Sequence, residues 1–192
     1  MNVWKVAFFT LSGAIVLLLA LLIYWATSPV KTAVPSAEEP EAKETDSVLY
    51  VETTADDFEK LAIKYIKREL KNSALPVEIE VNDSIQISSE IVAFGYNVPV
   101  LMKFNPVVNE HGNIHLVQSE VNVGSLNLPP SMVLKLLDQA VQFPEWMVIR
   151  PDAKEIFVDL SNLTLSSGAK VKAKEIDLKN NQIQLEIVIP NQ

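Results

Sequence analysis

The chain has 192 residues, 48% of them hydrophobic, with a formal net charge of −8 and no cysteine. The lack of cysteine excludes disulfides, a thiol nucleophile and a lipid attached to a cysteine. The acidic balance argues against nucleic acid as a partner, because proteins that bind nucleic acid present a basic surface to it.

The first element is an apolar segment over residues 6–26, VAFFTLSGAIVLLLALLIYWA, in which no residue is charged. As a helix it is about 30 Å long, which matches the hydrocarbon core of a membrane. A signal peptide is the competing interpretation, but its apolar region is usually only about 7–15 residues long. Pro35 also stands where a cleavage site ending in Ala37 would need a small residue. The sequence therefore predicts an uncleaved transmembrane anchor.

The charges that flank this segment predict its orientation. Lys5 precedes it and Lys31 follows it, and the short tail before it has no room to fold. We expect residues 1–5 in the cytoplasm and the rest of the chain outside the cell membrane.

Residues 27–48 are rich in Pro, Ala, Ser and Glu. Such a composition cannot bury enough apolar surface to offset the loss of chain entropy on folding. These residues are expected to form an acidic flexible linker, followed by one extracytoplasmic domain over residues 49–192.

The domain is expected to open with a helix over residues 54–71, with Thr54 as its N-cap. Four lysines fall within an arc of about 60° on the face opposite the apolar residues. They are Lys60, Lys64, Lys67 and Lys71. Two interpretations stay open: a solvated face that balances an acidic domain, or a surface that docks on anionic lipid or on a partner protein.

Strands with alternating apolar residues are expected from Val77 to Phe104 and again from Ile114 to Val123. Pro129 and Pro130 stop the second run, and a helix over residues 132–142 follows, with Ser131 as a candidate N-cap. Apolar residues cover about 200° of this helix, roughly twice what a surface helix needs. It is therefore expected to be buried on more than one side.

Alternation resumes after Pro144 and continues to Ile189, with a hairpin turn at residues 179–181. One helix, about four strands, a second helix and about four more strands predict an α+β domain. We expect one large curved antiparallel sheet packed against two helices. Lys170, Lys172 and Lys174 alternate along one strand, as is typical of a protected sheet edge.

No catalytic site, metal site or cofactor is predicted. His111 and His115 have the spacing of two zinc ligands on a helix, but a predicted turn at Gly112 separates them. Ser-x-x-Lys occurs at residues 28–31 and 167–170 without the other elements of a serine-lysine active site. We predict a protein that is not an enzyme.

Several segments are similar to a known family. They include FGYNVPVLMKFNP from residue 94, GNIHLVQSEVNVGSLNLPPSMVL from residue 112, WMVIRPDAKEIFVDL from residue 146 and IDLKNNQIQLEIVIP from residue 176. They resemble the YpmS family, which comprises single-span proteins of Gram-positive bacteria. This resemblance implies no catalytic residues. The order of elements also resembles half-barrel lipid-binding domains, in which a curved sheet wraps around helices and an acyl chain.

The leading functional hypothesis is a membrane-anchored module of the cell envelope that binds lipid or another amphiphile. Its candidate ligand-binding residues are apolar side chains of the second helix and of one strand, which in the alternative interpretation are plain core. They are Met102, Phe104, Met132, Leu136, Leu137, Ala140, Val141 and Phe143. The second hypothesis is a non-enzymatic envelope scaffold that docks a partner protein by a sheet edge or by the basic face of the first helix of the domain.

Overall fold

The structure, a computed structural model, describes residues 3–27, 46–69, 77–93, 96–126, 128–163, 165 and 167–190. The chain divides into two compact units, Met1–Val30 and Lys31–Gln192. The first unit holds a single helix, α1 (Val3–Thr27). All the other elements belong to the second unit. The predicted linker falls mostly on residues 28–45, which lie outside the described residues.

Helix α1 covers the segment for which a transmembrane anchor was predicted. Large apolar side chains along it are exposed, among them Phe9 and Leu17. A membrane span needs about 20 residues of sustained apolarity. In the described parts of the chain, no helix is both long enough and apolar enough to cross a membrane. This finding corrects the prediction of an anchor over residues 6–26.

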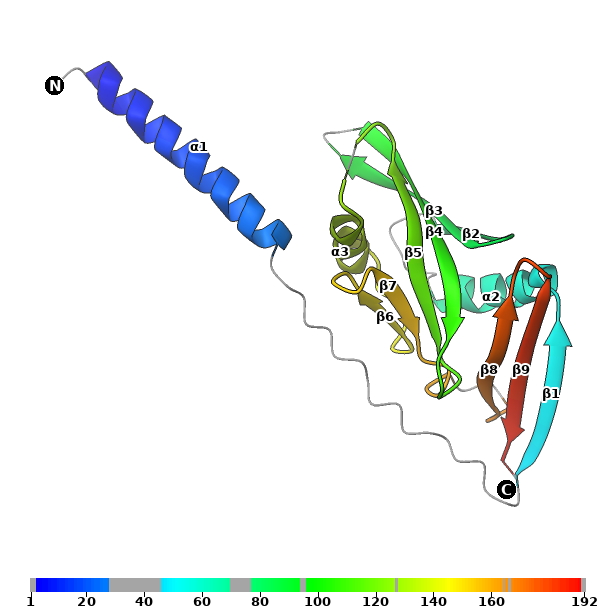
Figure 1. The fold of residues 1–192 in the computed structure, drawn as a ribbon. Coiled ribbons are helices and arrows are strands. Elements are labelled where there is room, and N and C mark those ends of the chain that lie inside the picture. The colour runs from blue at the N-terminus through cyan, green and yellow to red at the C-terminus, as the bar shows by residue number, and fades with distance from the viewer. Residues whose placement is uncertain are drawn as a thin grey trace. The chain divides into compact units, whose positions relative to one another are not determined.

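The second unit contains two antiparallel sheets (Figure 1). A three-stranded sheet has the order β1-β9-β8, and a six-stranded sheet has the order β2-β3-β4-β5-β7-β6. The elements in chain order are β1 (Ser47–Thr53), α2 (Ala55–Glu69), β2 (Val77–Val81), β3 (Ile85–Ala93), β4 (Tyr96–Val108), β5 (Ile114–Val123), α3 (Pro130–Ala140), β6 (Met147–Arg150), β7 (Glu155–Val158), β8 (Lys170–Asp177) and β9 (Gln182–Ile189).

This topology corrects the prediction of one large curved sheet. The last hairpin, β8–β9, does not extend the six-stranded sheet but pairs with β1, in a register that runs from Ser47↔Ile189 to Thr53↔Ile183. The start of β1 falls where a linker was expected, so the third strand of this sheet was missing from the prediction.

The two helices of the second unit begin differently. Thr54 caps α2 as predicted, because its Oγ1 accepts the backbone N–H of Asp57 at 3.3 Å. Helix α3 begins at Pro130, with Pro129 as its N-cap residue and no side-chain cap, so the predicted cap at Ser131 is wrong. Proline suits the first turn of a helix, where its missing N–H would have no partner within the helix.

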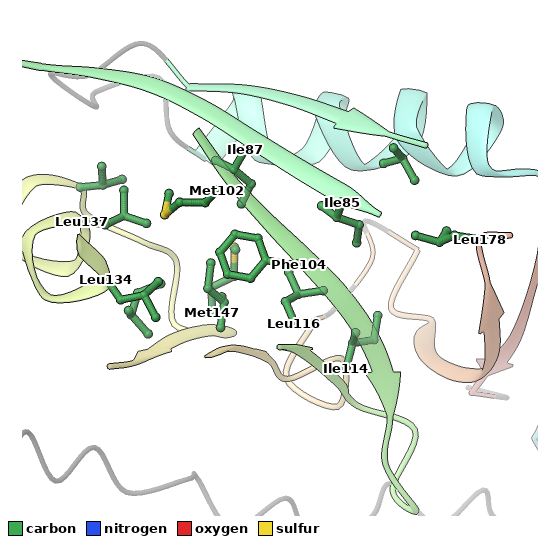
Figure 2. Close-up of a cluster of buried hydrophobic side chains, with 14 of the residues drawn as sticks. Ile85, Ile87, Met102, Phe104, Ile114, Leu116, Leu134, Leu137, Met147 and Leu178 are labelled. Atoms are coloured by element: carbon green, nitrogen blue, oxygen red, sulfur yellow. The ribbon is translucent and has the colours of Figure 1, made fainter. Parts of the chain in front are cut away.

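A continuous hydrophobic core joins the two sheets and both helices. Met102 and Phe104 of β4, Leu134 of α3 and Ile183 of β9 are completely buried in it. Figure 2 shows Met102 and Phe104 between Leu134 and Leu137 of α3 and Ile87 of the neighbouring strand. The shared core makes the second unit one folded body with two sheets.

Candidate functional site: a groove at an open sheet edge

A groove with a volume of about 450 Å³ lies beside β6, the last strand of the six-stranded sheet. Its lining residues come from the end of α3, from the loop that follows it and from β6. The lining residues are Asp138, Gln139, Val141, Gln142, Phe143, Pro144, Glu145, Met147, Val148 and Ile149. A volume of this size can hold several side chains of a binding partner.

The backbone of β6 offers hydrogen-bonding groups to this groove. Asp159 N–H donates to the carbonyl oxygen of Trp146 at 2.8 Å, which makes this pair a hydrogen-bonded pair of the β6–β7 ladder. Because such pairs alternate along an antiparallel ladder, the N–H and C=O groups of Met147 and Ile149 point away from β7. Met147 N–H donates to Pro144 within the loop. The Met147 carbonyl and both groups of Ile149 therefore face the outer edge.

Two other sheet edges are covered by parts of the same chain. In β2, the backbone N–H of Val81 donates to Oε2 of Glu59 on α2 at 2.6 Å. In β8, the backbone N–H of Ala173 donates to the carbonyl oxygen of Gly112 at 2.8 Å. Natural proteins cover or charge their edge strands to prevent unwanted pairing. In contrast, no strand within the described ranges pairs with the outer side of β6.

The groove is acidic. Its ten lining residues include the carboxylates of Asp138 and Glu145 and no lysine or arginine. Partial burial raises the pKa of Asp138 above its ordinary value, because the carboxylate loses hydration there. A cation close to Asp138 would favour the ionised form of its carboxylate.

A second space, enclosed between α3 and the sheet, has a volume of only about 20 Å³. Its walls are almost entirely apolar and are formed by Ser89, Val100, Met102, Val123, Leu128, Val133, Leu136 and Leu137. A space of this size is close to that of one water molecule. An acyl chain would enter only if α3 moved away from the sheet.

Five of the eight predicted ligand-binding residues line one of these two spaces. Met102, Leu136 and Leu137 line the small enclosed space, whereas Val141 and Phe143 line the groove. The other three are in neither set of lining residues. Phe104 is fully buried in the core, Met132 is half-buried and Ala140 is exposed.

The predicted basic stripe is described only in part. Lys60 and Lys64 are exposed on α2, and the Lys60 ammonium lies 2.9 Å from Oδ1 of Asp57. The hydrogen bond and charge of Asp57 raise the pKa of Lys60, so the lysine stays charged and is already paired with a carboxylate. Lys67 is in α2, but its side chain and all of Lys71 lie outside the described residues.

Sequence reasoning missed a polar network around His115 on β5. The Asn109 Oδ1 accepts the backbone N–H groups of His111 and Asn113 at 3.0 and 2.9 Å, which fixes its amide orientation. The Asn109 amide nitrogen therefore donates to His115 Nε2, 3.4 Å away. His115 Nδ1 then carries the proton and donates to Oε1 of Glu155 at 3.0 Å.

Arg150 completes this network, because its Nη1 donates to the same Glu155 oxygen at 2.5 Å. The buried Glu155 carboxylate thus receives donors from β5 and β6. Both His115 nitrogens are occupied, and His111 is exposed in the turn. The network ties Arg150, at the end of β6, to Glu155 of β7 and His115 of β5.

Comparison with known proteins identifies the family. The profile of DUF2140, described as an uncharacterized protein family conserved in bacteria, matches residues 2–189. The chain is also 27% identical over 192 residues to the uncharacterized protein YpmS of Bacillus subtilis strain 168, and the match covers 100% of both chains. No solved structure matches it. The resemblance to the YpmS family is thus confirmed, and the chain belongs to the DUF2140 family.

Proposed function

We propose that the second unit is a protein-interaction module that binds an extended segment of a partner protein as an added strand along β6. The observation that carries this proposal is an unpaired strand edge that borders a groove of about 450 Å³. In binding by strand addition, backbone hydrogen bonds supply affinity and adjoining pockets select alternate side chains. Both parts lie side by side at β6.

The interior of the groove suits such a segment. The half-buried Phe143 offers apolar surface, together with the small exposed parts of Val141 and Met147, while Gln139 and Gln142 offer amide groups that can bind a peptide backbone. The backbone N–H and C=O of Ile149, which point away from β7, supply one donor and one acceptor within β6. An added strand would extend the six-stranded sheet to seven.

The test uses phage-displayed peptides selected on the full chain, with their binding measured by fluorescence anisotropy. Hydrogen exchange reports on the amide of Ile149, which should become protected when a selected peptide binds. The variant Gln142→Trp fills the groove from an exposed position and should weaken binding at least tenfold. The matched control is Glu78→Trp, which places the same side chain at an exposed position of β2, away from the groove lining.

Peptides that bind without protecting the amide of Ile149 would refute strand addition. The same conclusion would follow if the Gln142→Trp and Glu78→Trp variants bound the selected peptides equally well.

A second candidate function is binding of lipid or another amphiphile under α3. It is supported by the apolar walls of the enclosed space, which three of the predicted residues line. The full chain, purified from its host, should then carry lipid that native mass spectrometry detects. Leu136→Trp, which fills the space, should remove that lipid. A protein that carries no lipid in the native spectrum would refute this candidate.

A further inference from the structure

The composition of the groove beside β6 restricts what can occupy it. Asp138 stands at the end of α3 and Glu145 in the loop before β6, so carboxylates come from two elements that meet at the groove. The lining contains no cation to neutralise them. The whole chain is also acidic, with a net charge of −8, which attracts basic partners over long distances.

The geometry of an added strand determines which of its side chains meet these carboxylates. Met147 and Ile149 are buried, with 9% and 2% of their surface exposed, and their side chains point into the core beneath α3. Side chains directly opposite each other in paired strands lie on the same face of the sheet. A residue of the partner that pairs beside Met147 or Ile149 therefore projects toward the end of α3.

The lining of the groove combines apolar side chains with a carboxylate. Val141 is buried and Phe143 is half-buried, and both line the groove together with Asp138. Lysine and arginine match this arrangement, because their aliphatic stems cover apolar surface while their charged ends reach polar groups.

We propose that the partner segment carries a lysine or arginine on its face toward α3, with the stem on Val141 and Phe143 and the charge paired with Asp138. Glu145 adds a second negative charge at the rim. This inference rests on the proposed strand addition and names the chemistry of the segment that β6 accepts.

The electrostatic state of Asp138 supports this choice. Partial burial raises the pKa of Asp138, because the carboxylate loses hydration in the groove. A lysine or arginine in the groove would lower that pKa again, so binding favours the ionised carboxylate. Glutamate or aspartate at the same position of the partner would add a third negative charge, which costs affinity.

The experiment uses three synthetic peptides that alternate threonine and valine and differ only at one central position, which holds lysine, norleucine or glutamate. Norleucine keeps most of the lysine stem without its charge. Affinity for the full chain is measured by fluorescence anisotropy, and hydrogen exchange at Ile149 verifies the site. The lysine peptide should bind about tenfold more tightly than the norleucine peptide, and the glutamate peptide should bind most weakly.

Three variants of the full chain show which carboxylate causes the preference for the lysine peptide. Asp138→Asn should remove the preference for lysine over norleucine, and Glu145→Gln should reduce it. The matched control is Asp83→Asn, which changes an exposed carboxylate in the turn after β2 and should leave the preference unchanged. Thermal unfolding verifies that each variant is folded.

The possible results separate this inference from the proposed function. If all three peptides bind equally and protect the amide of Ile149, strand addition stands and the selection of a basic residue is wrong. A preference for lysine that survives in Asp138→Asn also overturns the inference. If none of the peptides protects Ile149 up to millimolar concentration, the basic-segment inference and the strand addition on which it rests both fail.

Discussion

At the scale of single residues, Gly112 joins the two sheets of the second unit. It has a φ of 79°, and its carbonyl oxygen accepts the backbone N–H of Ala173 on β8. A Cβ atom at this position would lie 2.7 Å from Cβ of Lys172 and 3.2 Å from the backbone oxygen of Ala173. The turn between β4 and β5 can approach β8 so closely only because residue 112 has no side chain.

We therefore predict that Gly112→Ala lowers the free energy of unfolding by more than the roughly 1 kcal/mol expected from a positive φ alone. Gly168→Ala is the matched control, because Gly168 has a φ of 78° and a methyl group added there would meet nothing within 4 Å. Urea unfolding of both variants measures the difference between strain alone and strain with a clash. Equal losses would show that a methyl group at residue 112 does not clash with β8.

His115 provides a second prediction at this scale. The Asn109 amide donates to Nε2, so the neutral ring must carry its proton on Nδ1, where Glu155 accepts it. Long-range ¹H–¹⁵N spectra of the full chain should show the Nδ1-protonated tautomer for His115. Asn109→Ala should let the tautomers mix, because it removes the donor to Nε2. A dominant Nε2-protonated form in the unchanged chain would contradict the network.

At the scale of elements, α2 protects one edge of the six-stranded sheet. The carboxylate of Glu59 accepts the backbone N–H of Val81, although it lies 22 residues earlier in the chain. The helix thus covers a donor that another chain could otherwise use. This contact explains why a polar residue is half-buried on the face of α2 that meets β2.

Glu59→Ala is predicted to lower the free energy of unfolding by about 1–3 kcal/mol, because it leaves the Val81 N–H without its charged acceptor. The amide of Val81 should also exchange faster with solvent. Lys60→Ala is the control, since the Lys60–Asp57 pair is exposed to solvent and such pairs contribute little to stability. Urea unfolding and hydrogen exchange measure both effects, and an unchanged Val81 exchange rate would refute the protective role of Glu59.

The elements were more predictable from the sequence than their arrangement. Alternation of apolar residues identifies strands such as β5, where Ile114 and Leu116 are buried and Val117 is exposed. It cannot show that β1 pairs with β9, because this pairing depends on contacts between residues at least 130 positions apart. Helical periodicity predicts that Leu61 of α2 is buried with the other apolar residues of that helix, yet the structure leaves 52% of Leu61 exposed.

The candidate site depends on this arrangement of strands, so most of it could not be predicted from the sequence. Val141 and Phe143 stood out as apolar residues near the end of a helix, but nothing in their spacing indicates that β6 is an edge strand. The His115 network forms because β7 lies between β5 and β6, which places Glu155 beside Arg150. The resemblance to a family located neither feature.

At the scale of the whole molecule, the two sheets depend on each other. Val171 and Ile183 of the smaller sheet belong to the same hydrophobic cluster as Met102 and Phe104 of the larger one. Separating the sheets would expose this shared core, so they should unfold together in one transition. None of the described residues of α1 is a member of this cluster.

This division predicts that residues 46–192 fold without the residues before them. Their midpoint of thermal unfolding should equal that of the second unit in the full chain within about 2 °C, because a loss of 1 kcal/mol would shift it by about 2–4 °C. A chain of residues 54–192 is the matched comparison, since it also lacks β1 and leaves one side of β9 unpaired. It should unfold at a lower temperature or fail to fold. If residues 46–192 and residues 54–192 unfold at the same temperature, β1 has no structural role. If residues 46–192 do not fold without the residues before them, the two compact units do not fold independently.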